Sequence, residues 1–169
     1  MRPEKEQRTR MKFDTPTQQQ AYTQVNAWMT EIAGNADTGM AFEADEEAPI
    51  FGVSYGSAYV EVEVAPFSWE GDDGSEEQDA LLIISASVVA GAEMNAESMR
   101  YLLEKNEDLA IGAFSLGEGD EIILSTTIPF SYCEDSEELE TYLIMICDTA
   151  DSLDDEIIVR WGGHRASDV

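Results

Sequence analysis

Basic residues are scarce in this sequence, which has nine lysines and arginines against 36 aspartates and glutamates and a formal net charge of −27. The four bases that follow Lys12 are Arg100, Lys105, Arg160 and Arg165, and they face 34 acids, a net charge of −30 for that part of the chain. Proteins that bind nucleic acid or anionic lipid contact the phosphates with clustered cations. The sequence therefore predicts no nucleic-acid and no membrane partner. A solvated surface suited to a salty cytoplasm is the simpler interpretation of the acidity, and a basic peptide partner is the alternative.

Long apolar runs and cysteines are few as well. No run of 18 apolar residues occurs, so no transmembrane span is expected. The opening residues MRPEKEQRTR have no apolar segment behind them and do not resemble a secretory signal. Two cysteines are too few for a disulfide scaffold and fit a reducing compartment. The expected location is the cytoplasm.

Residues that carry catalysis are equally sparse. His164 is the only histidine, so no second histidine is present to share a metal. Cys133 follows a predicted strand, and Cys147 lies on the apolar face of a predicted helix, where packing is its expected role. No glycine-rich phosphate loop is present. The sequence predicts a non-enzymatic protein without catalytic residues and without a cofactor.

Two acidic clusters invite a metal interpretation. Asp151, Asp154 and Asp155 lie three and four residues apart on a predicted helix, so they could form a solvated face, share a cation, or pair with Arg160 or Arg165. The loop 71–79 lacks the ligand spacing of a helix–loop–helix calcium site and is more simply an exposed turn. We predict no metal site.

The pattern of apolar residues predicts one domain over residues 14–169 after a flexible tail, residues 1–13, in which Met11 is an alternative start to Met1. Thr15 or Thr17 caps a first helix that ends at Gly34, and Asn95 with Ser98 caps a second helix. A third helix, capped by Ser136, has a seam of apolar residues at alternating spacings of four and three: Leu139, Leu143, Ile146, Ala150, Leu153 and Ile157.

Between these helices the sequence predicts strands joined by hairpins. The expected strands are 40–45, two strands within 49–67 around Gly56-Ser57, 80–91, 109–116 and 121–130, with 68–79 as an acidic loop. Strands linked in this way form an antiparallel sheet. The predicted fold class is therefore α+β: an antiparallel twisted sheet with an N-terminal helix, a middle helix and a long C-terminal helix.

Four segments in this order resemble the YbjN-like family, which shares its fold with class I type III secretion chaperones of the CesT kind. The match is closest to cyanobacterial-type members. The segments are FGVSYGSAYVEVEV (51–64), SVVAGAEMNAESMRYLLEKNEDLAIGAFSL (87–116), GDEIILSTTI (119–128) and TADSLDDEIIVRWGGHRASD (149–168). The acidic tract 43–47 and the tail are the parts that the resemblance does not cover.

The resemblance implies a secretion-chaperone-like fold and a chaperone-like or adaptor protein that binds an extended segment of a partner protein, which the acidity would restrict to basic and apolar segments. It also suggests a homodimer. A regulator of signal transduction that acts by protein contact is the alternative. A partner segment could add to a sheet edge or lay its apolar side chains in grooves. The candidate site is the exposed strand 58–65 with the aromatic residues in and around it, for which core packing is the other possible role: Phe51, Tyr55, Tyr59 and Phe67.

The end of the third helix has a predicted structural role. Gly162 and Gly163 stop the helix, and Arg160 and Arg165 neutralise its negative end and nearby carboxylates. Together with Trp161 they are expected to lock the C-terminus onto the domain.

Overall fold

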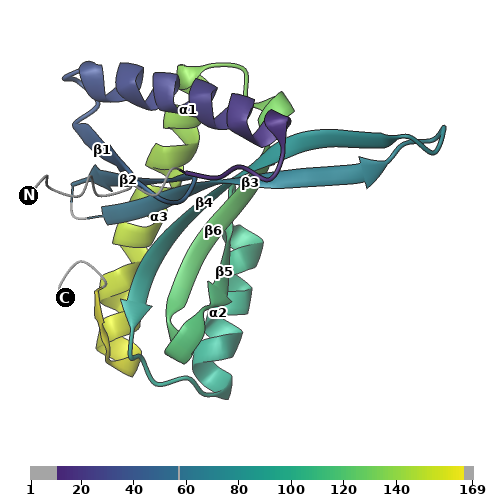
Figure 1. The fold of residues 1–169 in the computed structure, drawn as a ribbon. Helices are drawn as coiled ribbons and strands as arrows, with labels where there is room; N and C mark the ends of the chain where they lie inside the picture. Colours follow the sequence, from purple (N-terminus) through teal and green to yellow (C-terminus); the bar gives the residue numbers. More distant parts are fainter. Residues whose placement is uncertain (1–10, 57, 166–169) are drawn as a thin grey trace, which may run out of the picture.

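A computed structural model describes residues 11–56 and 58–165 (Figure 1). Ser57 of the predicted turn and most of the predicted tail lie outside the described residues. In chain order the elements are α1 (Pro16–Gly34), β1 (Met40–Ala44), β2 (Ile50–Tyr55), β3 (Ala58–Glu70), β4 (Glu76–Ala90), α2 (Ala96–Asp108), β5 (Ala113–Leu116), η1 (Glu118–Asp120), β6 (Ile122–Pro129), η2 (Phe130–Tyr132), α3 (Ser136–Trp161) and β7 (His164–Arg165).

The strands form one antiparallel, seven-stranded sheet in the order β1-β2-β3-β4-β6-β5, with β7 paired to the end of β4. The sheet twists strongly along β3 and β4 (Figure 1). These features confirm the predicted α+β class and its antiparallel sheet with three helices.

Helices α1 and α3 pack against one face of the sheet and against each other. The apolar stripe of α1 is buried, including Trp28 and Met29, and so is the seam of α3 except for the half-buried Leu153. The sheet contributes alternate residues to the same core, such as Val60, Val62 and Val64 on β3. The core therefore lies on the helix side of the sheet.

Side-chain caps fix where the helices begin. Thr15 Oγ1 accepts from Gln18 N–H at 3.1 Å, and Asn95 and Ser98 form a reciprocal capping box. At α3 the cap is Asp135, which accepts from Glu138 N–H at 2.9 Å, rather than the predicted Ser136. Ser136 is instead the first helical residue, because the preceding aspartate offers a stronger, charged acceptor to the helix N-terminus.

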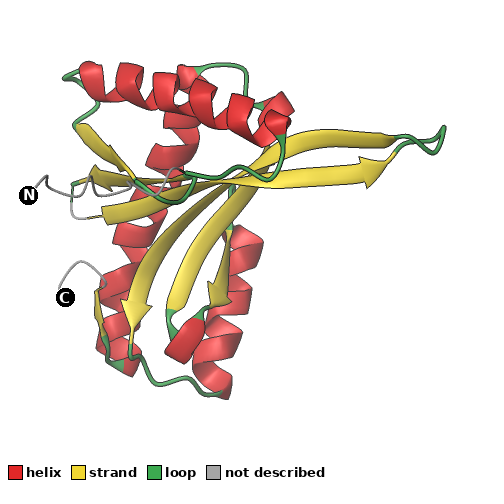
Figure 2. Ribbon diagram, viewed as in Figure 1, coloured by secondary structure: helices red, strands yellow, loops and turns green. Residues whose placement is uncertain are grey.

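The predicted loop 68–79 is instead a two-stranded ribbon, which we call the arm (residues 67–79). The ladder continues from Ala65↔Leu81 to Glu70↔Glu76, and only residues 71–75 turn. Figure 2 shows both strands extending beyond the helices. Most residues of the arm are exposed, so it lacks the one-sided apolar alternation by which a strand is recognised.

At the base of the arm, hydrogen bonds to other parts of the chain occupy polar groups on both edges of the ribbon. On the β3 edge, Val64 N–H donates to Pro49 O, and Val64 O accepts from Gln18 Nε2, each at 2.9 Å. Pro66 is the next residue that faces this edge, and it has no N–H to offer a further strand. On the β4 edge, Ser131 Oγ donates to Asp79 Oδ2 at 2.6 Å.

One further prediction about a strand was wrong. The strand expected at 109–116 covers only 113–116, because Gly112 has a φ of 80° that breaks the extended backbone. The segment 58–65 pairs with β2 on one side and with β4 on the other, so of the two binding modes considered for it only a groove is left. The edges of the main sheet are β1 and β5.

Candidate functional site

The sheet face opposite α1 and α3 is covered by no helix among the described residues. Strand alternation sends Tyr59, Glu61 and Glu63 to this face while the intervening valines of β3 enter the core. Gly52 of β2 and Ser85 of β4 are the cross-strand partners of Glu61. Residues from several strands therefore share one accessible surface.

Two adjoining hollows run across the strands on this face, with volumes of about 500 and 310 Å³. They share Tyr59 and Glu61, so we treat them as one feature, the acidic trough. Among the described residues that line it, none is a lysine or an arginine. Its carboxylates come from β1, the β1–β2 loop, β3 and the start of β6: Glu43, Asp45, Glu46, Glu47, Glu61 and Glu121.

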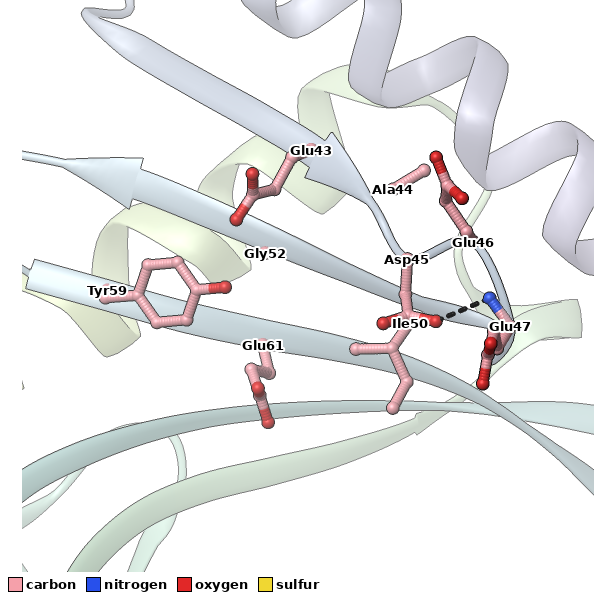
Figure 3. Close-up of a pocket in the computed structure, with 9 residues that line it drawn as sticks. All are labelled: Glu43, Ala44, Asp45, Glu46, Glu47, Ile50, Gly52, Tyr59 and Glu61. Carbon is pink, nitrogen blue, oxygen red and sulfur yellow. Dashed lines mark hydrogen bonds between the residues drawn. The ribbon is translucent and has the colours of Figure 1, made fainter.

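The floor of the trough is an aromatic ring laid over a glycine. The Tyr59 ring lies above Gly52, with Glu43 on one side and Glu61 on the other (Figure 3). A Cβ at Gly52 would collide with the Tyr59 hydroxyl and stand 2.8 Å from Cζ. The ring lies flat on the sheet only because residue 52 has no side chain. Tyr59 keeps 42% of its surface exposed, so its ring is open to a partner.

The electrostatic potential in the trough is negative. Partial burial raises the pKa of the Tyr59 hydroxyl above its usual value, and the charges of Glu43 and Glu61 raise this pKa further. At one end, the N–H groups of Glu47 and Ala48 both donate to Asp45 Oδ1 at 2.7 Å and lower the pKa of Asp45. At the other end Ser87 Oγ donates to Glu121 Oε1. Hydrogen bonds therefore hold Asp45 and Glu121, one at each end of the trough, in place.

The four aromatic residues predicted to bind peptide do not form one site. Phe51 is fully buried and stacks with Tyr22 at 4.8 Å between ring centroids, and Tyr55 packs against the core. Tyr59 lies in the trough. Phe67 lies on the arm, eight residues further along β3, a separation of about 27 Å in an extended strand. Phe51 thus packs in the core, which was the alternative to peptide binding. Peptide binding by Tyr59 and Phe67 stays a prediction.

The arm carries an exposed aromatic pair. Phe67 and Trp69 are 40% and 41% exposed, and their ring centroids are 5.4 Å apart. Both lie outside the core, on a ribbon that projects from the body (Figure 2). This pair is a second accessible apolar surface on the molecule.

At the C-terminal end, the chain leaves α3 and returns to the sheet. Gly162 and Gly163 have φ values of 72° and 89°, and β7 then pairs Arg165 with Val89 and His164 with Ala90. A Cβ on Gly163 would stand 2.6 Å from Ala90 O, so the close approach requires glycine.

Two arginines hold this corner, by different contacts. Arg165 donates from Nε to Asp154 Oδ2 and from Nη2 to Asp155 Oδ1, each at 2.6 Å. Arg160 pairs with Glu156 at 2.6 Å and lies 5.0 Å from the ring centroid of Tyr101. Asp154 is buried, so a solvated face, the first of the three interpretations of these aspartates, does not hold for Asp154. For Asp154 and Asp155 the structure supports another of the interpretations, a pair with Arg165.

Trp161 completes the corner. Its ring centroid lies 5.0 Å from that of Tyr101, and its carbonyl accepts from Glu93 N–H at 2.8 Å. The residues predicted to lock the C-terminus are therefore in mutual contact or on adjoining turns, and their effect on stability stays a prediction.

The surroundings of both cysteines disfavour the thiolate form. Both Cys133 and Cys147 are buried and free, and burial raises the pKa of each thiol, to about 11 and about 12. Over residues 11–56 and 58–165, no cluster of three or more histidine, cysteine or acidic side chains has a geometry suited to a metal ion. Within the same ranges no helix is both long and apolar enough to cross a bilayer.

Sequence reasoning missed the trough because its residues come from separate segments. The acidic tract 43–47 looked like a local addition, yet the β1–β2 hairpin places it beside Glu61 of β3. One signal was available: the alternation Glu61, Val62, Glu63, Val64 shows that one face of this strand meets water. That alternation does not show which other segments share the face.

Comparisons with known proteins identify the fold and the family. A chain in "Structure of the HopA1-SchA Chaperone-Effector Complex" superposes with a TM-score of 0.56 at 6% identity, covering 80% of this chain and 97% of that one. A chain in "Crystal Structure of the ExsC-ExsE Complex" gives a TM-score of 0.53 at 18% identity, covering 80% and 95%. At these identities the likeness concerns the fold. A search of curated protein sequences finds no match.

The family model described as "T3SS (YopN, CesT) and YbjN peptide-binding chaperone 1", TY-Chap1, matches residues 19–169. This span includes all the described strands and nearly all of α1. It confirms the YbjN-like and CesT-like resemblance, while placement in the cyanobacterial-type subgroup stays a prediction. The chain belongs to the TY-Chap1 family of peptide-binding chaperones.

Proposed function

We propose that this protein is a chaperone-like binding protein that holds an extended, basic and apolar segment of a partner protein in the acidic trough. The observation that carries the proposal is the arrangement of Tyr59 between Glu43 and Glu61 on a sheet face that no described helix covers. The family supplies the role of peptide binding, and the trough supplies the chemistry of the peptide.

Several physical terms favour a cation next to an apolar group in this trough. A lysine or arginine over the Tyr59 ring would gain a cation–π contact of about 0.5–2 kcal/mol, and the flanking carboxylates would add charge-assisted hydrogen bonds. Ile50 and Ile123, at opposite ends of the trough, offer contact to apolar side chains. The field also speeds the encounter with positively charged segments and repels acidic ones.

The direct test uses two synthetic dodecapeptides, one alternating arginine and leucine and the other alternating glutamate and leucine. We expect the full chain to bind the first and not the second, as measured by calorimetry. Glu43→Gln with Glu61→Gln should weaken binding about tenfold or more, since two charges that face the ligand are lost. The matched control, Glu31→Gln with Asp148→Asn, removes two exposed carboxylates from α1 and α3 on the other side of the sheet. Equal losses in both variants, or no binding at all, would overturn the proposal.

The alternative role is a regulator that acts by contact with one folded protein. The same trough would then receive a basic surface rather than an extended segment. Cross-linking in cells followed by mass spectrometry separates the two: many clients linked through disordered segments indicate a chaperone, and one stoichiometric folded partner indicates a regulator.

We also propose a homodimer that forms through α2. On its outer side Leu103 is 69% exposed and Met99 is 44% exposed, beside a shallow hollow that Arg100 also lines. Two of the five described bases, Arg100 and Lys105, lie on this helix and offset part of the charge of its four acidic residues. Light scattering should give a dimer for the full chain and a monomer for Leu103→Asp. A monomeric wild-type chain contradicts this part of the proposal.

Finally, we propose a non-enzymatic role in the cytoplasm. Membership of a family of peptide-binding chaperones supports the non-enzymatic role, and the two buried, unpaired thiols fit a reducing compartment. Two free thiols in protein isolated under conditions that trap native redox states would agree with this location, whereas a mixed disulfide would contradict it.

A further inference from the structure

The charges of this chain are divided between two parts. Five of its nine bases lie within residues 1–12, against only Glu4 and Glu6, whereas the rest of the chain is strongly acidic. Residues 1–10 lie outside the described part. The acidic trough has six carboxylates and, among its described lining, no base. The chain thus contains both a basic segment and a surface that fits one.

The first described residues bring this segment close to the trough. The Phe13 ring lies 5.3 Å from the Tyr22 ring, and Tyr22 in turn stacks on Phe51 of β2. The charge of Asp45, which lines the trough, acts on the Tyr22 hydroxyl and helps to raise its pKa. Phe13 therefore lies beside the β1–β2 hairpin, whose loop forms one end of the trough.

The length of the segment is sufficient. Each residue of an extended chain spans about 3.3 Å, so twelve residues reach about 40 Å from Phe13. A tether of this length is long enough to pass from the β1–β2 hairpin beside Phe13 to the trough on the opposite face of the sheet.

We propose that the basic segment 1–12 of the same chain occupies the acidic trough between Glu43 and Glu61 and competes there with partner segments. This inference rests on the proposed function, because it assigns to the trough the same ligand chemistry. Tethering gives the segment an effective concentration of the order of millimolar. A partner must displace it, so weak basic segments are excluded and only those with better apolar contacts bind.

Two variants of the full chain test the competition. In the first, Arg2, Lys5, Arg8 and Arg10 are all replaced by glutamine, which changes only residues outside the described fold. We expect this variant to bind the arginine–leucine dodecapeptide about tenfold more tightly than the wild-type chain at low salt. The second combines these changes with Glu43→Gln and Glu61→Gln. The gain in peptide affinity should disappear in this second variant, because the tail no longer has a trough to occupy. The four chains form a double-mutant cycle, which separates a contact between tail and trough from the general change in net charge.

A second measurement detects the contact itself. A nitroxide on Thr9→Cys should broaden the amide signals of Gly52, Tyr59 and Glu61 in the wild-type background and leave those of Leu103 on α2 unchanged. The native thiols are buried, so the label attaches to the new cysteine alone. Excess dodecapeptide or about 1 M salt should restore the broadened signals.

The outcomes separate the two proposals. Equal peptide affinities with no broadening in the trough would overturn the intramolecular contact and leave the proposed function intact. If no peptide binds to any variant, the proposed function fails, and the broadening alone then decides whether the tail lies in the trough. Broadening that reaches α2 equally would show a tail without a fixed site and would also overturn the inference.

Discussion

Arg165 is the residue on which the C-terminal corner depends most. Its partner Asp154 has a side chain only 8% exposed, and a buried carboxylate without a cation is strongly destabilising. We expect Arg165→Gln to lower the free energy of unfolding by about 2–4 kcal/mol, as measured by urea denaturation. Arg160→Gln should cost about 1 kcal/mol, since the Arg160–Glu156 pair is half exposed.

Arg100 provides the control for these two variants. Its pair with Glu104 is 3.8 Å long and largely exposed, so Arg100→Gln should change the free energy of unfolding by no more than about 0.5 kcal/mol. Equal losses for Arg100→Gln and Arg165→Gln would show that the corner has no special role in stability.

The buried ionisable side chains predict how stability depends on pH. The pKa of the Cys147 thiol is raised from 9.0 to about 12, and burial also raises the pKa of Tyr101 from 10.0 to about 12. The folded state keeps these protons at pH values where the unfolded chain loses them. Their contribution to stability is therefore complete below about pH 9 and is lost as the pH rises towards 12.

The measurement is the free energy of unfolding from pH 8 to pH 11, determined with urea. We expect a continuous fall above about pH 9, and a shallower fall for Cys147→Ala, which removes one of the responsible groups. A slope that is the same in wild type and variant would mean that Cys147 does not contribute.

At the scale of the elements, the arm is a part of the sheet that contributes little to the core. Phe67 and Trp69 stack on each other but remain about two-fifths exposed, whereas Trp28 on α1 is 7% exposed. We expect Phe67→Ser with Trp69→Ser to change the free energy of unfolding by about 1 kcal/mol or less, and Trp28→Ala to cost about 3–5 kcal/mol. A large loss of stability from the arm variant would show that the ribbon belongs to the folding core.

The helices were predictable from sequence, and the reasons are local. An apolar stripe at helical spacing and a capping side chain are both encoded within a few residues, as at Thr15 and at the Asn95–Ser98 box. The arm was missed because strand recognition depends on one buried face, and most of its residues meet water on both sides. The trough was missed because strand pairing, which joins Glu43 to Gly52 and Gly52 to Glu61, is a long-range property.

For the whole molecule, net charge is the property with the clearest consequence. A charge of −27 on 169 residues produces repulsion that opposes the compact state. Raising KCl from about 0.05 M to about 1 M shortens the screening length to about 3 Å, so we expect the melting temperature to rise steadily. NaCl should act equally. A melting temperature that falls over this range would mean that salt weakens attractive pairs more than it relieves repulsion.

The Gly52–Tyr59 contact has a consequence for how this sequence can change over evolutionary time. The Tyr59 ring fills the space that any side chain at residue 52 would need. A larger residue at 52 therefore displaces the Tyr59 ring from the sheet, either by turning this exposed side chain away or by selecting a smaller residue at 59. Relatives that keep the aromatic ring flat on the sheet should keep the glycine. The floor of the trough would then be inherited as a pair of residues.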